Sequence, residues 1–371
     1  MFPFFSYIHR PFSIFLLLLL LFPPPLPATD IPFSAAGEVI DFNPNNTWHT
    51  FMRFLDAGKG SRPDGMADLK RYFRRFGYLP IPPENLNFTD AFDDEFEQAL
   101  FAYQKNLGLS ETGKLDFNTM SVIVSPRCGV GDFTDGGGGE HGLKTTRRFA
   151  FFYGQPRWVQ SAPMMLTYAF SPTYVIDYVG MPEIRAAFAR AFERWSAAIP
   201  VNFTEAEEYS TADIRIGWYS GDHGDGEAFD GRLGVLAHAF SPENGRFHLD
   251  AAERWAVDFD EEKSKAAIDL ESVATHEIGH VLGLAHSSVK EAIMYPSLSP
   301  RTKKLELRMD DVEGIQSLYG SNPNFRYDSR LESDLSSGRG IVSERSEGLM
   351  WSVMAMAVVA WIVNNFTRIS N

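Results

Sequence analysis

The chain has 371 residues and a formal net charge of −14, without a long run of Lys or Arg. This length allows two folded domains with further segments at the termini. The acidic balance excludes nucleic acid as the expected partner and suits cations with oxygen ligands, such as calcium. The only cysteine is Cys128, which excludes a disulfide within the chain. In a secreted protein, such a cysteine indicates an intermolecular bridge or a functional thiol.

The N-terminal segment, residues 1–28, predicts a secretory signal peptide. A basic residue, Arg10, precedes an apolar run rich in leucine, and the small residue Ala28 stands at its end. This order is typical of segments that direct secretion and are then removed. Prolines interrupt the apolar run early, which disfavours a membrane helix.

Residues 29–148 are predicted to form a small helical domain. Three segments have apolar residues at helical spacing, and proline-containing turns separate them. The segments are 48–55, 66–78 and 93–107. A glycine run at 136–139 then indicates a flexible linker that proteases can cleave.

Residues 149–320 predict a second domain of mixed α+β class. Alternating patterns at 165–170, 213–219 and 235–240 indicate strands. Residues 182–198 predict an amphipathic helix with proline at its start. Strands combined with helices in this order favour an α+β fold.

The C-terminal part combines a polar linker, residues 321–348, with a hydrophobic signal, residues 349–371. Its apolar stretch, 349–363, is short for a membrane span. A ten-residue spacer separates it from three small residues, Ser336, Ser337 and Gly338. That order predicts attachment of a glycosylphosphatidylinositol (GPI) anchor near 336–338, and a short membrane anchor is the alternative.

The motif HEIGHVLGLAH, which begins at His276, indicates the chemistry. On a helix, His276 and His280 lie on one face, where they can bind one metal ion. Gly283 can adopt the left-handed conformation that ends a helix, so that His286 becomes a third ligand. Three protein ligands with an open position are typical of catalytic zinc. Glu277 lies beside the ligands and can accept a proton from the attacking water.

This motif resembles the extended zinc motif of the metzincins, and AIMYP at 292–296 looks like their Met-turn. The resemblance to matrixins covers residues 48–320 and is closest to plant members, which lack a haemopexin domain. It implies a metzincin catalytic domain with a twisted, mostly parallel five-stranded sheet and three helices, preceded by a three-helix propeptide domain. It also implies that Met294 forms a hydrophobic floor beneath the zinc ligands. Cys128 disfavours another metzincin, such as an astacin-like enzyme.

The segment PRCGVGD, residues 126–132, resembles the matrixin cysteine switch. The resemblance implies that the Cys128 thiolate binds the catalytic zinc and displaces the attacking water. Arg127 and Asp132 would form an ion pair that holds the loop. Matrixins usually have proline at the position of Gly131, so we expect a more flexible loop and a weaker latch. Activation then requires removal of the propeptide by another protease or by autolysis.

The resemblance also implies two further metal sites. Three histidines and one aspartate would hold a structural zinc with the four ligands of a closed site: His223, Asp225, His238 and His248. A calcium site would combine three carboxylates with three backbone carbonyls. Its carboxylates belong to Asp230, Asp250 and Glu253, and its carbonyls to Gly231, Leu233 and Val235.

Together these features predict a zinc-dependent endopeptidase, made as a latent zymogen, that hydrolyses internal bonds of extracellular proteins. By resemblance, substrate would add a strand to the edge strand at 234–238. A pocket bounded by Ser272, Pro296 and Leu298 would take a hydrophobic, leucine-like residue after the cut. The alternative function is a non-catalytic protein that binds the extracellular matrix or wall, but such a protein would not need Glu277.

The predicted location is the extracellular face of the plasma membrane through a lipid anchor, or the extracellular space as a secreted protein. We expect a monomer. Three N-x-Thr triplets predict N-glycosylation, and they begin at Asn45, Asn87 and Asn202.

Overall fold

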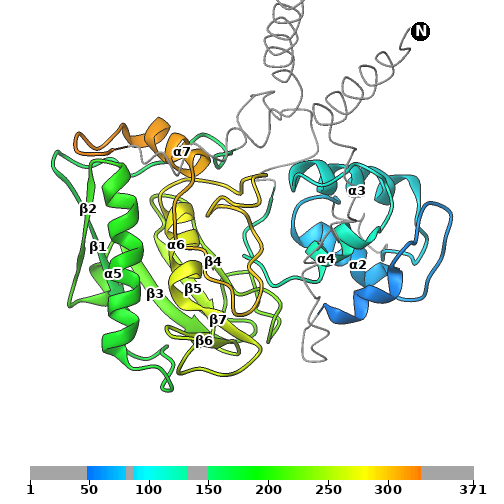
Figure 1. Ribbon diagram of the computed structural model, residues 1–371, viewed down its shortest axis with the longest axis horizontal. Helices are drawn as coiled ribbons and strands as arrows, with labels where there is room; N and C mark the ends of the chain where they lie inside the picture. Colours follow the sequence, from blue (N-terminus) through cyan, green and yellow to red (C-terminus); the bar gives the residue numbers. More distant parts are fainter. Residues whose placement is uncertain (1–47, 81–86, 133–148, 327–371) are drawn as a thin grey trace, which may run out of the picture. The chain divides into compact units, whose positions relative to one another are not determined.

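The computed structural model describes residues 48–80, 87–132 and 149–326 (Figure 1). Within these ranges, no helix is both long and apolar enough to cross a membrane. The predicted signal peptide, the glycine linker, Asn45 and the GPI-attachment residues 336–338 lie outside the described residues.

The N-terminal domain contains three α-helices and one short 3-10 helix. The α-helices are α2 (Met66–Arg75), α3 (Asp94–Asn106) and α4 (Phe117–Ile123), and the 3-10 helix is η1 (His49–Phe54). The side chain of Asp93 caps α3 by accepting a hydrogen bond from the Phe96 backbone N–H at 2.9 Å. The prediction of three helices is confirmed, but the segment at 48–55 is only a 3-10 helix. The third α-helix is α4, whose seven residues are too few for periodicity to reveal.

The second domain is built on a five-stranded sheet in the order β2-β1-β3-β5-β4. All neighbouring pairs are parallel except β4 and β5, which confirms the mostly parallel sheet. A separate two-stranded sheet pairs β6 (Arg254–Ala256) with β7 (Ala267–Asp269). The strands of the main sheet are β1 (Met164–Phe170), β2 (Val201–Glu205), β3 (Ile214–Tyr219), β4 (Ala237–Ala239) and β5 (Arg246–Asp250).

Three α-helices complete this domain: α5 (Met181–Ala198), α6 (Leu270–Val281) and α7 (Met309–Tyr319). A one-turn 3-10 helix, η2 (Tyr209–Thr211), precedes β3. Helices α5 and α6 lie side by side against the sheet (Figure 1), where Trp195 of α5 donates to the Thr275 carbonyl of α6 at 2.9 Å. Every residue of α6 is buried. The helix that carries the zinc motif is therefore held rigidly in the centre of the domain.

Candidate active site

Helix α6 begins and ends at positions that its sequence specifies. Asp269 caps its start by accepting from the backbone N–H of Ser272 at 2.8 Å. Gly283 follows its end with a φ of +106°, and a Cβ at this position would collide with the Pro156 carbonyl oxygen. Only glycine fits here, so the chain turns sharply and returns His286 to the helix.

The three histidines of the motif meet at their Nε2 atoms. The Nε2 of His280 lies 3.1 Å from that of His276 and 3.2 Å from that of His286. The Nδ1 of His276 donates to the Ile293 carbonyl, and that of His280 donates to the Leu284 carbonyl, each at 2.7 Å. Because these Nδ1 atoms carry the ring protons, the Nε2 lone pairs face one another, which suits a shared cation. Burial holds the pKa of all three rings below its ordinary value, so they are neutral ligands.

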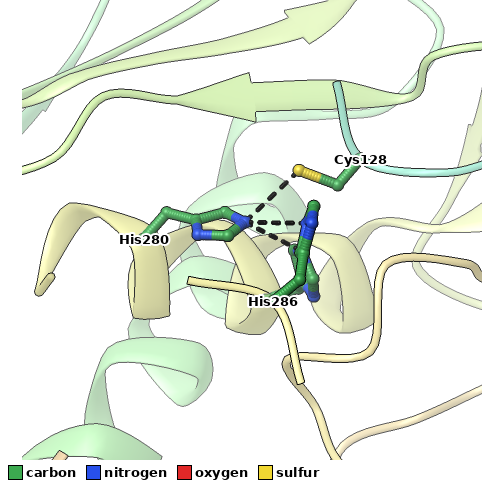
Figure 2. Close-up of side chains that lie close together, drawn as sticks. Cys128, His280 and His286 are labelled. Atoms are coloured by element: carbon green, nitrogen blue, oxygen red, sulfur yellow. Dashed lines mark hydrogen bonds between the residues drawn. The ribbon is translucent and has the colours of Figure 1, made fainter. Parts of the chain in front are cut away.

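Cys128, which follows α4 in the chain, approaches the same point. Its Sγ lies 3.4 Å from the Nε2 of His280, and Figure 2 shows the thiol and the His286 ring both directed toward that atom. The four ligand atoms lie within 4.8 Å of one another. Burial, together with the nearby Glu277 carboxylate, raises the pKa of the Cys128 thiol. A thiolate at this place therefore needs a cation, and three nitrogens with one sulfur are a donor set that fits zinc.

Glu277 is completely buried beside the Cys128 thiol. Apart from this thiol, its two oxygens have no hydrogen-bond partner among the described residues. Burial raises the pKa of Glu277 to about 8. A carboxylate whose proton affinity lies near neutral pH is suited to accept and return a proton during a reaction.

The loop that carries Cys128 is held by a buried charge cluster. Arg127 pairs with Asp132, as the resemblance implied, and its guanidinium lies 3.7 Å from the Phe76 ring centroid. Asp132 also accepts from the Tyr78 hydroxyl and from Nδ1 of His286, each at 2.7 Å. Burial alone would raise the pKa of Asp132, but Arg127 and His286 bring it below its ordinary value. The Asp132 carboxylate thus also orients His286, a candidate zinc ligand.

The backbone of the same loop lies between the segments at 234–236 and 296–297 and hydrogen-bonds to both. Arg127 N donates to the Gly234 carbonyl at 3.0 Å, and Leu236 N donates to the Arg127 carbonyl at 2.8 Å. On the other side, Cys128 N donates to the Pro296 carbonyl at 2.9 Å. Arg127 thus pairs in parallel with the edge at 234–236 and antiparallel with Ser297. Strand β4 is shorter than the predicted strand at 235–240.

A second cluster brings together the four residues implied for a structural zinc. Oδ2 of Asp225 lies 2.9 Å from Nε2 of His223, 2.8 Å from Nε2 of His238 and 2.8 Å from Nδ1 of His248. Burial lowers the pKa of both His238 and His248 to about 4. Three imidazoles around one carboxylate form a closed set of four donors, which fits a tetrahedral zinc.

The residues implied for calcium come from two segments, the loop at 230–235 and residues 250–253 at the end of β5, which a hydrogen bond between Leu233 and Glu253 joins. Burial raises the pKa of Asp230, that of Asp250 to about 6 and that of Glu253 to about 8. One oxygen of Asp250 and one of Glu253 are buried without a partner among the described residues. Glu253 also accepts from Leu233 N at 2.5 Å, and Val235 N donates to Asp230 at 2.8 Å. Unmet buried carboxylate oxygens are the donors that calcium prefers, and Gly231 lies on the same loop with a φ of +94°.

Met294 lies beneath α6 and is 1% exposed. A Cβ on Gly279 would collide with its sulfur, so the methionine packs directly against the zinc-motif helix. Asp311 of α7 accepts from the backbone N–H groups of Ile293 and Met294, at 2.9 and 3.0 Å. The sequence analysis did not identify this use of Asp311, which fixes the turn.

A small cavity that opens to solvent lies where the substrate pocket is expected. Ser272, Pro296 and Leu298 line it, together with His276 and Glu277. Lys304 also lines this cavity, and the sequence analysis did not include it. The two described glycosylation candidates, Asn87 and Asn202, are both exposed.

Comparison with known proteins gives two family matches. Residues 157–320 match the matrixin family, and residues 62–123 match the family described as a putative peptidoglycan binding domain. The chain is 53% identical to metalloendoproteinase 4-MMP of Arabidopsis thaliana over 81% of this chain and 86% of that protein. It is 49% identical to Arabidopsis metalloendoproteinase 1-MMP over 89% and 91% of the two chains.

A more distant relative is the human neutrophil collagenase, with 38% identity over 71% of this chain and 52% of that protein. These matches do not favour the alternative of a non-catalytic binding protein. The chain is therefore a metalloendopeptidase that belongs to the zinc-dependent matrixin family, in which calcium is also typical.

Proposed function

We propose that this protein is made as a latent zymogen whose propeptide closes the catalytic zinc site with Cys128. The observation that carries the proposal is the convergence of the Cys128 sulfur with three imidazole nitrogens next to a buried Glu277. His276, His280 and His286 hold the zinc, and the thiolate occupies the position that water needs. Arg127 and Asp132 keep the thiol in place.

Removal of residues 29–148 opens the groove and starts catalysis. A substrate chain then pairs with the backbone at 234–236, where Arg127 pairs in the latent form. Zinc, when bound, polarises the scissile carbonyl and makes water more acidic. Glu277 takes the proton of the attacking water and donates it to the leaving amine. Backbone pairing makes recognition tolerant of sequence, while the cavity beside Ser272 and Leu298 selects an apolar residue after the cut.

The two further metal sites have structural roles in this proposal. The zinc bound by His223, Asp225, His238 and His248 and the calcium bound near Glu253 stabilise a domain that has no disulfide. Calcium neutralises Asp230, Asp250 and Glu253, whose burial would otherwise be costly.

Secretion and anchoring complete the proposal. The sequence of residues 1–28 supports entry into the secretory pathway, with glycans on Asn45, Asn87 and Asn202. The small residues at 336–338 support a GPI anchor on the outer face of the plasma membrane. Release of the protein from cells by a phosphatidylinositol-specific phospholipase is the expected result, and a protein that stays bound would favour a short membrane anchor.

Cleavage of casein by the full-length chain, before and after limited proteolysis of the propeptide, tests the enzymatic proposal. We expect activity only after proteolysis, with loss on chelation of metal. Glu277→Ala should lower kcat/KM by about 10³-fold, because it removes the proton acceptor and no metal ligand. The exposed Glu261→Ala provides the matched control. A Glu277→Ala protein that retains zinc and full activity would refute the assigned role.

A further inference from the structure

A cationic residue, Lys304, lines the cavity beside the zinc-motif helix, although an apolar pocket does not require one. Among the described residues that line it, Lys304 is the one lysine, and no arginine is present. The other lining residues are apolar or small, apart from His276 and Glu277 of the reaction centre. The position of this lysine therefore bears on which side chains the cavity accepts.

Lys304 is fixed at both ends. Its backbone N–H donates to Oγ of Ser272 at 2.8 Å, and that hydroxyl donates to Asp269 at 2.6 Å. The segment is thus attached to the first turn of α6. At the other end, Nζ donates to the Lys290 carbonyl at 2.7 Å and lies 5.2 Å from the Tyr295 ring centroid. A side chain anchored in this way loses little further entropy when it binds a substrate group.

The ammonium group of Lys304 has N–H donors that lack an acceptor among the described residues. It carries three N–H donors, and the Lys290 carbonyl is its one acceptor among the described residues. The residue is partly buried, and this partial burial lowers the pKa of the ammonium to about 8. An acceptor on a substrate side chain in the cavity can pair with an N–H donor that has no acceptor among the described residues.

Building on the proposed function, we propose that Lys304 is a specificity-determining residue that lets the cavity accept glutamine as the residue after the cut. Glutamine is long, and its amide oxygen accepts a hydrogen bond from Nζ. Glutamate has the same length, but its charge would enter a cavity that Glu277 also lines. Methionine has a similar length without a strong acceptor, so it separates hydrogen bonding from size.

The test uses the full-length chain after proteolytic removal of its propeptide. Peptides that differ only in the residue after the cut, with leucine, methionine, glutamine or glutamate, are compared by kcat/KM. We expect Lys304→Met to lower the glutamine-to-methionine ratio roughly tenfold, as for loss of a hydrogen bond to a charged group. Cleavage of the peptide with leucine after the cut should change by less than about threefold, since the backbone hydrogen bond of Lys304 to Ser272 remains.

Two further variants make the test decisive. Lys304→Arg keeps a donor in the cavity and should keep most of the preference for glutamine. Lys263→Met removes an exposed lysine that does not line the cavity and should leave all ratios unchanged. An unchanged glutamine-to-methionine ratio in Lys304→Met, or a wild-type enzyme that cuts the leucine peptide and rejects glutamine, would overturn the role of Lys304. Failure of the wild type to cut any peptide would instead refute the proposed function.

Discussion

The two histidine clusters of this protein hold similar donor sets but differ in the origin of the fourth donor. In the second cluster, all four residues lie between His223 and His248. In the first, Cys128 is 152 positions away from His280 and lies in the segment that we propose is removed on activation. A cluster made from one short segment stays closed, whereas a cluster completed by a removable segment can open.

The two clusters also differ in whether a proton acceptor lies beside them. One carboxylate oxygen of Asp225 contacts three imidazoles, so this carboxylate is not available to accept a proton in a reaction. The first cluster has Glu277 at its side, buried and with a raised pKa. The number of metal ligands alone therefore does not identify a reactive centre. What identifies it is a ligand that can be removed, such as Cys128, next to a side chain that can accept a proton, such as Glu277.

Asp225→Ala should give the largest effect, because it removes the one oxygen that three histidines contact. Structural zinc contributes on the order of 10 kcal/mol in small zinc-binding peptides. We expect mass spectrometry to find about one zinc per chain in place of about two, and the thermal unfolding midpoint to fall by more than about 5 °C. The exposed Asp222→Ala is the control. Two retained zinc ions would remove the distinction between the clusters.

Asp132→Asn should open the first cluster. It leaves Arg127 buried without its ionic partner, which typically costs about 3–5 kcal/mol. We expect a thiol reagent to modify Cys128 of the unproteolysed chain about a hundredfold faster or more. Asp68→Asn, which breaks an exposed pair with Arg71, should not change the rate. Equal rates in a folded Asp132→Asn protein would show that the charge cluster does not hold the thiol.

The calcium loop should make stability depend on pH when calcium is absent. The folded state raises the pKa of Glu253 from 4.5 to about 8 and that of Asp250 from 3.8 to about 6. The folded state therefore binds more protons than the unfolded state between these values, so stability is lost as pH rises from about 5 to 8. Denaturation in a calcium chelator should show this loss, and added calcium or Glu253→Gln should reduce it. Stability that rises with pH in the chelator would contradict the burial of these carboxyls.

Gly131→Pro should give the smallest effect and in the opposite direction to Asp132→Asn. Gly131 is not among the glycines with positive φ, a conformation that would exclude proline. Restricting the released loop should favour the latched state by about 0.4–1 kcal/mol. We expect thiol modification of Cys128 to slow by about two- to fivefold. A faster reaction would mean that the loop is strained by proline.

The parts of the site that follow from local rules could be predicted from the sequence. The spacing of His276 and His280 fixes their common face, and Gly283 marks the end of the helix. The strands at 165–170 and 213–219 also lie close to their predicted ranges, because their apolar residues alternate. The short helix α4 and the strands β2 and β5 gave no comparable periodic signal.

Contacts between distant segments could not be predicted in this way. The hydrogen bond between Asp132 and His286 joins residues 154 positions apart, and no local pattern encodes it. Lys304 lies in an irregular segment, where only the folded loop determines which side chain reaches the cavity. The ligand sets of the second zinc and the calcium came from resemblance alone, since their members are scattered between His223 and Glu253.

X-ray absorption at the zinc edge of the full-length, unproteolysed chain most directly tests closure of the catalytic zinc by Cys128. The expected result is one sulfur ligand per chain, at about 2.3 Å from the catalytic zinc. Averaged over the two zinc ions of the chain, this is half a sulfur ligand per zinc. The sulfur signal should disappear in Cys128→Ser and after removal of the propeptide, while both zinc ions remain. A spectrum with only nitrogen and oxygen ligands in the unproteolysed chain would contradict a thiolate-closed zymogen.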